Sequence, residues 1–273
     1  MIRCLSCLLL AVCFLIMLSC GTVAESDDIL LKHDYLLFSI GFQGLIVDEI
    51  YGNTLRFSFT NQSDEPLMVS IDSVKLDTVF IQTFFADLVE PGETHTQQVV
   101  IESAAQYMND WILTEVSADL WVYKADNLYD SDIFHDEVIF LPQGSDNRKA
   151  WVRAEKPSDI PVFDDYFATV TMINADHSSD KQLVFSLHSI GKTDRQLLIR
   201  ADKIWINGTP LSIYYASKLN GICQSFSTLE IQDGLDYLIN VPGQNTIKIT
   251  FELAVRDGQK LKTLKRENVS FKM

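Results

Sequence analysis

The stretch LMVSIDSVKLD at residues 67–77 has a counterpart 130 residues later, LLIRADKIWIN at residues 197–207. Apolar residues match apolar residues at nearly every core position, and Asp72 falls on Asp202. Apolar residues at alternate positions are typical of a strand that has one buried face. The repeat therefore predicts two similar β-rich halves.

The sequence around this repeat follows the same pattern in both halves. Alternating apolar segments lie at residues 55–59, 116–122, 183–187 and 247–255. Turn sequences separate them at residues 61–64, 90–93, 207–208, 220–221 and 241–243. Short strands between turns, without a long helical pattern, favour β-sandwiches. We expect an all-β chain with two tandem immunoglobulin-like sandwiches, and short helical turns at residues 102–110 and 233–239.

The boundary between the halves is placed by a polar, turn-rich segment, PQGSDNRK at residues 142–149. We predict that the first β-sandwich domain occupies residues 33–148 and the second residues 149–273. Each half, at about 110 residues, has the size of an immunoglobulin-like domain and can enclose its own core. Residues 151–153 would form an edge strand or pack at the seam between the domains.

The first 19 residues form a separate N-terminal segment. A single Arg3 precedes an apolar run at residues 8–18, and Ser19, Cys20 and Gly21 follow it. This order is typical of a secretory signal, and it predicts a lipidated Cys20 as the mature N-terminus, with residues 20–32 as a tether. Two alternatives remain open: cleavage after Ala24, or an uncleaved anchor. Two or more acyl chains would hold the protein at the extracytoplasmic face of the cell membrane.

Charge and cysteine content exclude several classes of protein. The chain has 22 Lys and Arg against 37 Asp and Glu, a net charge of −15, which disfavours nucleic-acid partners. Four of the five cysteines lie in or directly after the signal, so Cys223 has no partner for an internal disulfide or a multi-thiolate zinc site. We expect Cys223 to be a half-buried structural residue.

Sequence motifs for catalysis are missing. The five histidines are scattered, and the chain contains no nucleophile elbow, zinc-protease, phosphate-loop or dinucleotide motif. Acid and base catalysis needs a partnered group with a shifted pKa, and no spacing indicates such a pair. We therefore expect no catalytic residues, no metal and no cofactor.

The sequence contains two candidate binding sites, an aromatic pair and an acidic segment. Trp121 and Tyr123 alternate with apolar neighbours and should share an outward face, as a platform for a sugar ring or a protein partner, or else cover the seam between domains. The acidic segment at residues 126–137 could form a weak calcium loop through Asp126, Asp130, Asp132 and Asp136, but it lacks EF-hand spacing. A solvated hairpin loop is the favoured interpretation.

The order of motifs resembles a broad group of uncharacterised bacterial lipoproteins of the Gram-positive type. In them, a lipidation signal precedes β-sandwich modules that share an Asn-x-Ser-Asp start, two apolar strands and a Pro-Gly turn. Here the shared motifs lie at residues 61–64, 67–71, 74–76 and 91–92. The second half lacks the Asn-x-Ser-Asp start, and the first half has Asp77-Thr78 where Asn207-Gly208 stands in the second. The resemblance implies an extracytoplasmic, non-enzymatic module and carries over no functional residues.

These observations together predict a lipid-anchored extracytoplasmic protein that acts as a non-catalytic binding or structural module at the cell envelope. Its partners would be the membrane, through Cys20, and an envelope protein or glycan. The alternative is a solute- or glycan-binding protein associated with a transporter, with a cleft between the halves lined by Trp111, Trp121, Trp151 or Trp205. An enzyme that uses Cys223 or an acidic pair is a third, less favoured hypothesis.

Overall fold

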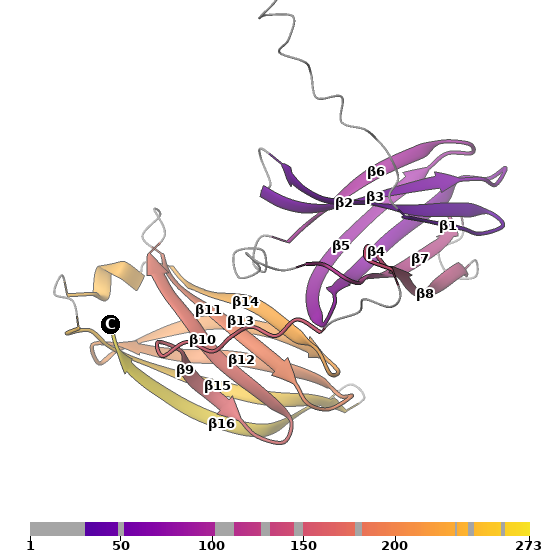
Figure 1. Ribbon diagram of the computed structural model, residues 1–273. Helices are drawn as coiled ribbons and strands as arrows, with labels where there is room; N and C mark the ends of the chain where they lie inside the picture. Colours follow the sequence, from indigo (N-terminus) through magenta and orange to yellow (C-terminus); the bar gives the residue numbers. More distant parts are fainter. Residues whose placement is uncertain are drawn as a thin grey trace, which may run out of the picture.

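The structure is a computed structural model that describes residues 31–48, 52–101, 112–126, 132–144, 150–177, 182–232, 234–239, 243–257 and 260–273. The predictions for residues 1–30, including Cys20, lie outside these residues. The described chain is almost entirely β-strand, as the sequence predicts, and forms β-sandwiches (Figure 1). None of its helical segments has the length and apolar character that a membrane span requires.

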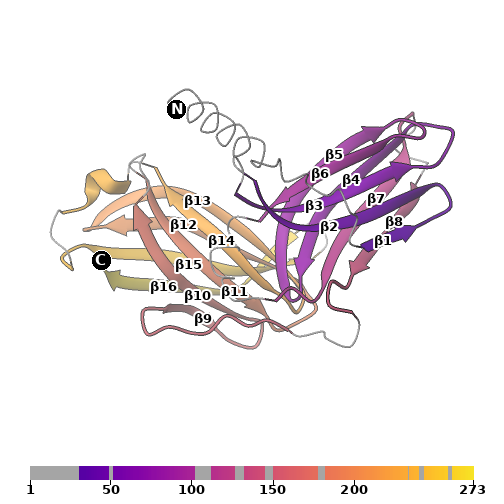
Figure 2. The same ribbon diagram turned by 45° about the horizontal axis from the view of Figure 1, so that its top comes forward.

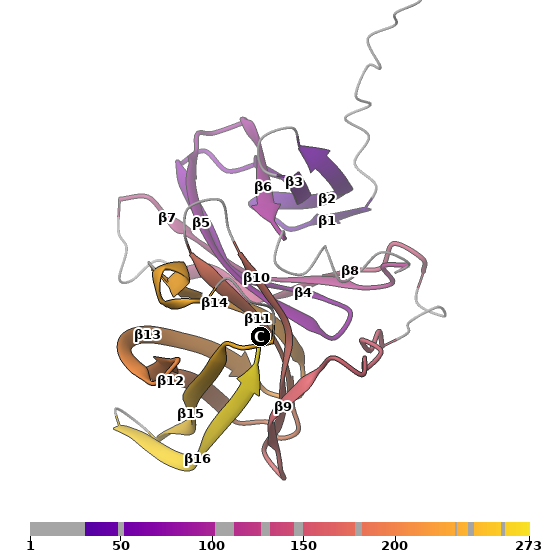
Figure 3. The same cartoon turned by 90° about the vertical axis from the view of Figure 1, so that its left-hand side faces the viewer.

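The first sandwich packs two layers of four strands against each other. One layer has the order β1 (Leu31–Asp34), β2 (Phe38–Asp48), β3 (Gly52–Asn61), β6 (Thr94–Val100). The other has the order β8 (Asp132–Phe140), β7 (Val116–Lys124), β4 (Leu67–Leu76), β5 (Val79–Val89). Figure 3 shows the two layers facing each other. The inward side chains of the predicted strands, such as Phe57, Val69 and Leu120, form the core between them.

The second sandwich repeats this plan. One layer has the order β9 (Ile160–Asp164), β10 (Ala168–His177), β11 (Leu183–Gly191), β14 (Gln224–Ile231). The other has the order β13 (Thr209–Asn220), β12 (Gln196–Ile206), β15 (Thr246–Asp257), β16 (Lys260–Lys272). A 3₁₀ turn, η2 (Gly234–Tyr237), lies where the second helical turn was expected. The first expected turn, at residues 102–110, lies outside the described residues.

The repeat extends to the irregularities of the strands. The register of β4 shifts between Ile71 and Ser73, and that of β12 shifts between Ala201 and Lys203, so Asp72 and Asp202 occupy equivalent β-bulges. Asp77 and Asn207, also 130 residues apart, both have positive φ, 50° and 52°, in the hairpin turns that follow. The Asp77-Thr78 turn is therefore the structural equivalent of the Asn207-Gly208 turn.

The strand order is one that the sequence pattern did not specify. In the first half, β2-β3-β6 faces β8-β7-β4-β5, which matches the immunoglobulin order A-B-E facing G-F-C-C′, with β1 added beside strand A. The second half has the same order with β9 in the place of β1. The fold is therefore immunoglobulin-like in connectivity as well as in size.

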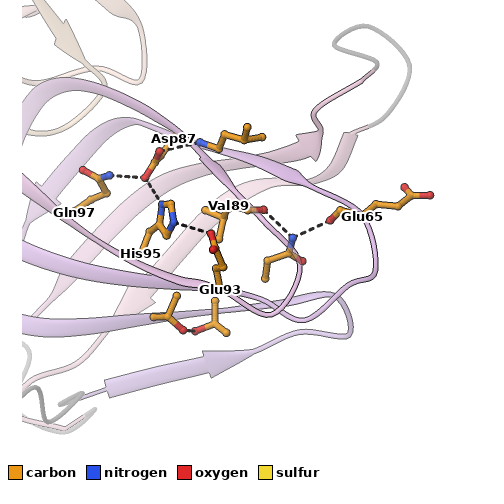
Figure 4. Close-up of polar contacts among 10 residues, drawn as sticks. Glu65, Asp87, Val89, Glu93, His95 and Gln97 are labelled. Carbon is orange, nitrogen blue, oxygen red and sulfur yellow. Dashed lines mark hydrogen bonds and ion pairs between the residues drawn. The ribbon is translucent and has the colours of Figure 1, made fainter.

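The Asn-x-Ser-Asp motif has a structural role. Asn61 is fully buried, and its amide nitrogen donates hydrogen bonds to the carbonyl oxygens of Glu65 (2.8 Å) and Val89 (2.9 Å) (Figure 4). The backbone N–H of Ser63 donates to Asn61 Oδ1 at 2.9 Å. Gly191 stands at the equivalent position of the second half, where a Cβ atom would lie 2.0 Å from the carbonyl oxygen of Gly221. The motif is absent there because no side chain fits.

The two sandwiches are joined through their sheets (Figure 2). β5 of the first and β14 of the second pair in parallel through Gln224–Val79 and Ser225–Phe80, which makes one eight-stranded sheet from two layers. Phe226 of the second half packs into the first core, and Phe80 of the first half packs into the second core. We call this region the seam.

Candidate functional site

The predicted aromatic platform is only partly present. Trp121 is half-buried and Tyr123 is only 7% exposed, so Tyr123 does not offer an open ring face as a platform. The Trp121 ring lies 5.0 Å from the Tyr123 ring and stacks on His135 at 5.3 Å. Its indole N–H donates to Asp132 Oδ1 at 2.8 Å. Trp121 therefore covers Tyr123 and is itself held in place by its neighbours.

The acidic segment is partly strand and not a continuous loop. β8 begins at Asp132, and this carboxylate is engaged by Trp121, while Asp136 accepts a hydrogen bond from the backbone N–H of Glu137 at 2.8 Å. Asp130 lies outside the described residues. Over the described part of the chain, no group of three or more His, Cys, Asp or Glu side chains could hold a metal ion.

The outer face of β4, β7 and β8 carries a polar hollow of about 430 Å³. Lys75 Nζ and Ser117 Oγ both donate to Glu137 Oε1 at 2.7 Å. Partial burial opposes ionisation of Glu137, but the hydrogen bonds from Lys75 and Ser117 lower the pKa of that carboxyl below its usual range. The Glu137 carboxylate therefore has both a cation and a hydroxyl as partners inside the hollow. The cluster links the three strands β4, β7 and β8.

A second charged cluster bridges the two layers of the first sandwich (Figure 4). Asp87 on β5 accepts hydrogen bonds at Oδ2 from His95 Nδ1 (2.8 Å) and Gln97 Nε2 (2.6 Å), both on β6. The Asp87 hydrogen bond raises the pKa of His95. Burial opposes ionisation of Asp87, yet the bonds from His95 and Gln97 lower its pKa. The pair is thus favoured in its ionic form, and it closes the open side between β5 and β6.

The seam is held by an uncharged hydrogen-bond network around Gln224. Its backbone N–H donates to the carbonyl oxygen of Thr78 at 2.6 Å, and its side-chain amide donates to Thr78 Oγ1 at 2.8 Å and to the carbonyl oxygen of Trp151. Gln224 Oε1 lies 2.9 Å from His188 Nε2, and the His188 ring stacks on Phe226 at 4.8 Å. Residues 151–153 are not an edge strand and pack at the seam.

Burial lowers the pKa of His188, which favours the neutral ring. A bidentate ion pair lies beside it, in the segment that links the domains, where Arg153 donates to the Asp159 carboxylate at 2.7 and 2.8 Å. The hydrogen bond from Arg153 lowers the pKa of Asp159. These groups hold the linker on the seam.

Two adjoining grooves lie next to the seam. One groove of about 690 Å³ lies between Ile81 and Gln82 of β5 and the strands β13 and β14. A second, of about 520 Å³, continues along the same two strands to Tyr237. They share Tyr214, Tyr215 and Thr228, and we call the two together the tyrosine groove.

Among the described residues, the groove is lined by tyrosines and by no tryptophan. Tyr214 is 90% exposed, while Tyr215 points into the sandwich and its hydroxyl lies 2.5 Å from Ser227 Oγ. Neighbouring residues of a strand point to opposite faces. Both tyrosines border the groove along the edge strand β13, although the Tyr215 ring is mostly buried. Among the four tryptophans, Trp121 stacks on His135, Trp151 packs near Phe226, and Trp205 lies under Lys248. Trp111 lies outside the described residues.

Cys223 is buried at the end of the β13–β14 turn. Its thiol donates to the carbonyl oxygen of Asn220 at 3.0 Å, and burial raises its pKa. A thiol with a raised pKa is a poor nucleophile, since the thiolate is the reactive form. The packing of Cys223 fits a structural residue.

Comparisons with known proteins leave the family undetermined. No protein-family model and no curated protein matches the chain. Among solved structures it aligns with β-glucuronidase 2 of Bacteroides uniformis, covalently bound to cyclophellitol-6-carboxylate aziridine, at 11% identity and a TM-score of 0.27, over 92% of this chain and 30% of that chain. The chain thus spans less than a third of that enzyme. A likeness this weak says nothing about activity or ligand.

Proposed function

We propose that the chain is a lipid-anchored extracytoplasmic protein that acts as a non-catalytic binding or structural module at the cell envelope. The observation that carries this proposal is the signal that ends in Ser19, Cys20 and Gly21, directly before two sandwiches. A lipidated Cys20 would supply the two or more acyl chains that stable anchoring requires. As in the bacterial lipoproteins that the motifs resemble, the sandwiches would then stand outside the membrane.

The polar groups of the described residues support the non-catalytic part of the proposal. Glu137 is held by Lys75, Asp87 by His95, and Asp159 by Arg153, each across strands or segments that the contact ties together. His188 is buried and stacked, and Cys223 is a buried thiol with a raised pKa. Each of these groups has a role in holding the fold, which supports a structural or binding role for the chain.

The membrane anchor is tested by intact mass and membrane partitioning of the protein from its native host. We expect the native protein to fractionate with membranes and to carry acyl chains at Cys20, and the variant Cys20→Ala to be released. Cys223→Ala is the matched control, which should keep the acyl mass. A soluble native protein that begins at Glu25 would contradict the proposal, because cleavage would then follow Ala24.

A second candidate function is a solute- or glycan-binding protein associated with a transporter. The tyrosine groove favours it, because the groove takes one wall from β5 of the first sandwich and the other from β13 and β14 of the second. A hollow between two domains is a common place for a small ligand. Both candidate functions share the absence of catalysis, so robust hydrolysis of a peptide or glycan by the purified protein would contradict both.

A further inference from the structure

The tyrosine groove carries little net charge, unlike the acidic protein as a whole. Among the described residues that line the first groove, Lys218 is the one that carries a charge, and among those that line the second it is Glu230. The whole chain has a net charge of −15. A groove whose two charges cancel, on a strongly acidic protein, fits an uncharged ligand better than a charged one.

The polar groups of the groove are hydroxyls and amides. Gln82, Ser217, Ser225 and Thr228 line the first groove, and Ser212, Thr228 and Gln232 line the second. Such side chains donate and accept hydrogen bonds without charge. They match the hydroxyls of a ligand that presents many neutral donors and acceptors along its length.

Tyr214 supplies the apolar contact that such a ligand needs. At 90% exposure its ring is free on the surface, and it borders both grooves. A tyrosine ring offers a broad apolar face and a polar tip. A sugar ring has a patch of C–H bonds on its face and hydroxyls at its rim, so it can stack on the tyrosine while its rim bonds the neutral side chains.

We propose that the tyrosine groove binds a neutral oligosaccharide, with Tyr214 as its stacking platform. This inference rests on the proposed function as a binding module and names its ligand class. The two adjoining grooves have volumes of about 690 and 520 Å³, and each lies within the range of about 300–1,000 Å³ that is typical of small-ligand sites. Together they have room for several linked sugar units. The seam sets the width of the groove, because Ile81 and Gln82 reach it from the first sandwich.

An extended peptide is the main competing ligand. It would be held by main-chain hydrogen bonds along a free strand edge, with pockets for alternate side chains. The edge of β13 carries Pro210 near its start, and the groove presents hydroxyls and amides rather than a row of such pockets. These features favour the oligosaccharide.

The test is isothermal titration calorimetry of the full chain, kept in a detergent without a sugar headgroup. The neutral probes are cellohexaose, xylohexaose, maltohexaose, mannohexaose and chitohexaose; the acidic probe is hexagalacturonate; the peptide probe is an uncharged hexapeptide. We expect binding of at least one neutral probe, with a loss of about tenfold in affinity in Tyr214→Ala, since one aromatic stacking contact has about that value.

Two variants serve as controls. Tyr214→Phe keeps the ring face and should bind within about twofold of the native chain, since the hydroxyl is not the platform. Tyr166→Ala removes another exposed tyrosine, which lies between β9 and β10 and away from the groove, and should leave affinity unchanged.

Several results would overturn the inference: binding of hexagalacturonate or the peptide alone, no binding of any neutral probe, or equal affinity in native and Tyr214→Ala protein. The outcome is separable from that of the anchoring experiment, because Cys20 precedes the strands of both sandwiches in the sequence. Solubility of the native chain would contradict the anchor while leaving glycan binding measurable.

Discussion

The two sandwiches share a strand order but close their open sides differently. In the first, Asp87 on β5 bonds His95 and Gln97 on β6. In the second, Tyr215 on β13 meets Ser227 on β14, and Ser227 stands at the position of Gln97 in the repeat. The core positions are alike because their side chains must pack against each other. The contact that bridges the two layers of each sandwich is free to change. The uncharged bridge belongs to the half that carries the groove.

The starts of β6 and β14 show the same contrast. Thr94 at the start of β6 shares an exposed hydrogen bond with Thr60, at 2.9 Å between the two hydroxyl oxygens. Gln224, at the equivalent position of β14, is buried and bonds Thr78 and Trp151 across the seam. The same repeat position is therefore exposed in the first half and part of the seam in the second. The two halves differ at this position while they share one strand order.

The largest loss of unfolding free energy should follow from removal of the Gln224 side chain at the seam. Gln224→Ala removes the side-chain amide that bonds Thr78, Trp151 and His188. The Trp151 carbonyl keeps the Thr78 hydroxyl as a donor, whereas His188 Nε2 loses its partner, and a buried polar group left unpaired costs about 1–3 kcal/mol. We expect the free energy of unfolding, from urea titration, to fall by about 2–4 kcal/mol. Thr94→Ala, its repeat counterpart, should change it by less than about 0.5 kcal/mol. Equal losses in the two variants would show that the seam adds no stability.

The seam should also weaken at acid pH through His188. Its folded pKa lies below the usual 6.5 because burial disfavours the charged ring. Above pH 6.5 both folded and unfolded chains hold it neutral, so its contribution is complete. As the pH falls below 6.5, the unfolded chain binds a proton first and stability declines until the pH reaches the folded pKa.

This loss is measured as the difference in unfolding free energy between native protein and His188→Gln across pH 5–8. The difference should shrink as the pH falls, because the variant has no ring to protonate. The facing charges are the Arg153–Asp159 pair, which favour opposite states of the ring. A constant difference over this range would show that His188 does not titrate with unfolding.

The sequence predicted the repeat and aligned Asp72 with Asp202, but it did not predict that both residues lie in β-bulges. It did not predict strand order or the seam. The seam depends on two parallel residue pairs, Gln224–Val79 and Ser225–Phe80, which join segments far apart in the chain. Alternation within one strand holds no information about such a partner.

Two aromatic predictions show the limit of period-two reasoning. Alternation places Tyr123 on the outer face, where it does lie opposite the core side, yet Trp121 covers it. The same rule directs the adjacent Tyr214 and Tyr215 to opposite faces of β13. They nonetheless border one groove, since β13 is an edge strand. The rule assigns a face correctly and says nothing of what covers that face.

The neutral bridge gives a smaller expected effect than the seam. Tyr215→Phe removes the hydroxyl that meets Ser227 in a buried setting, and we expect a loss of about 1 kcal/mol in unfolding free energy. The adjacent Tyr214→Phe is the matched control, with a change below about 0.5 kcal/mol because its hydroxyl lies in solvent. If both tyrosine variants were equally stable, the hydroxyl of Tyr215 would not bridge the layers.

The charged bridge should have the smallest effect, since partly exposed ion pairs contribute about 0–1 kcal/mol. Asp87→Asn should lower the unfolding free energy by about 0.5 kcal/mol at pH 6. The raised pKa of His95 gives stability that is complete below pH 6.5 and is lost as the pH rises through the folded pKa, the opposite direction to His188.

Proton-detected NMR titration of the His95 ring separates the charged bridge from the neutral one. In native protein the His95 pKa should lie above 6.5 because Asp87 bonds the protonated ring, and in Asp87→Asn it should fall toward 6.5. Glu93→Gln should shift it less, because the longer 3.3 Å contact from His95 Nε2 is the weaker of the two. An ordinary pKa in the native chain would mean that the first sandwich, like the second, closes its open side without charge.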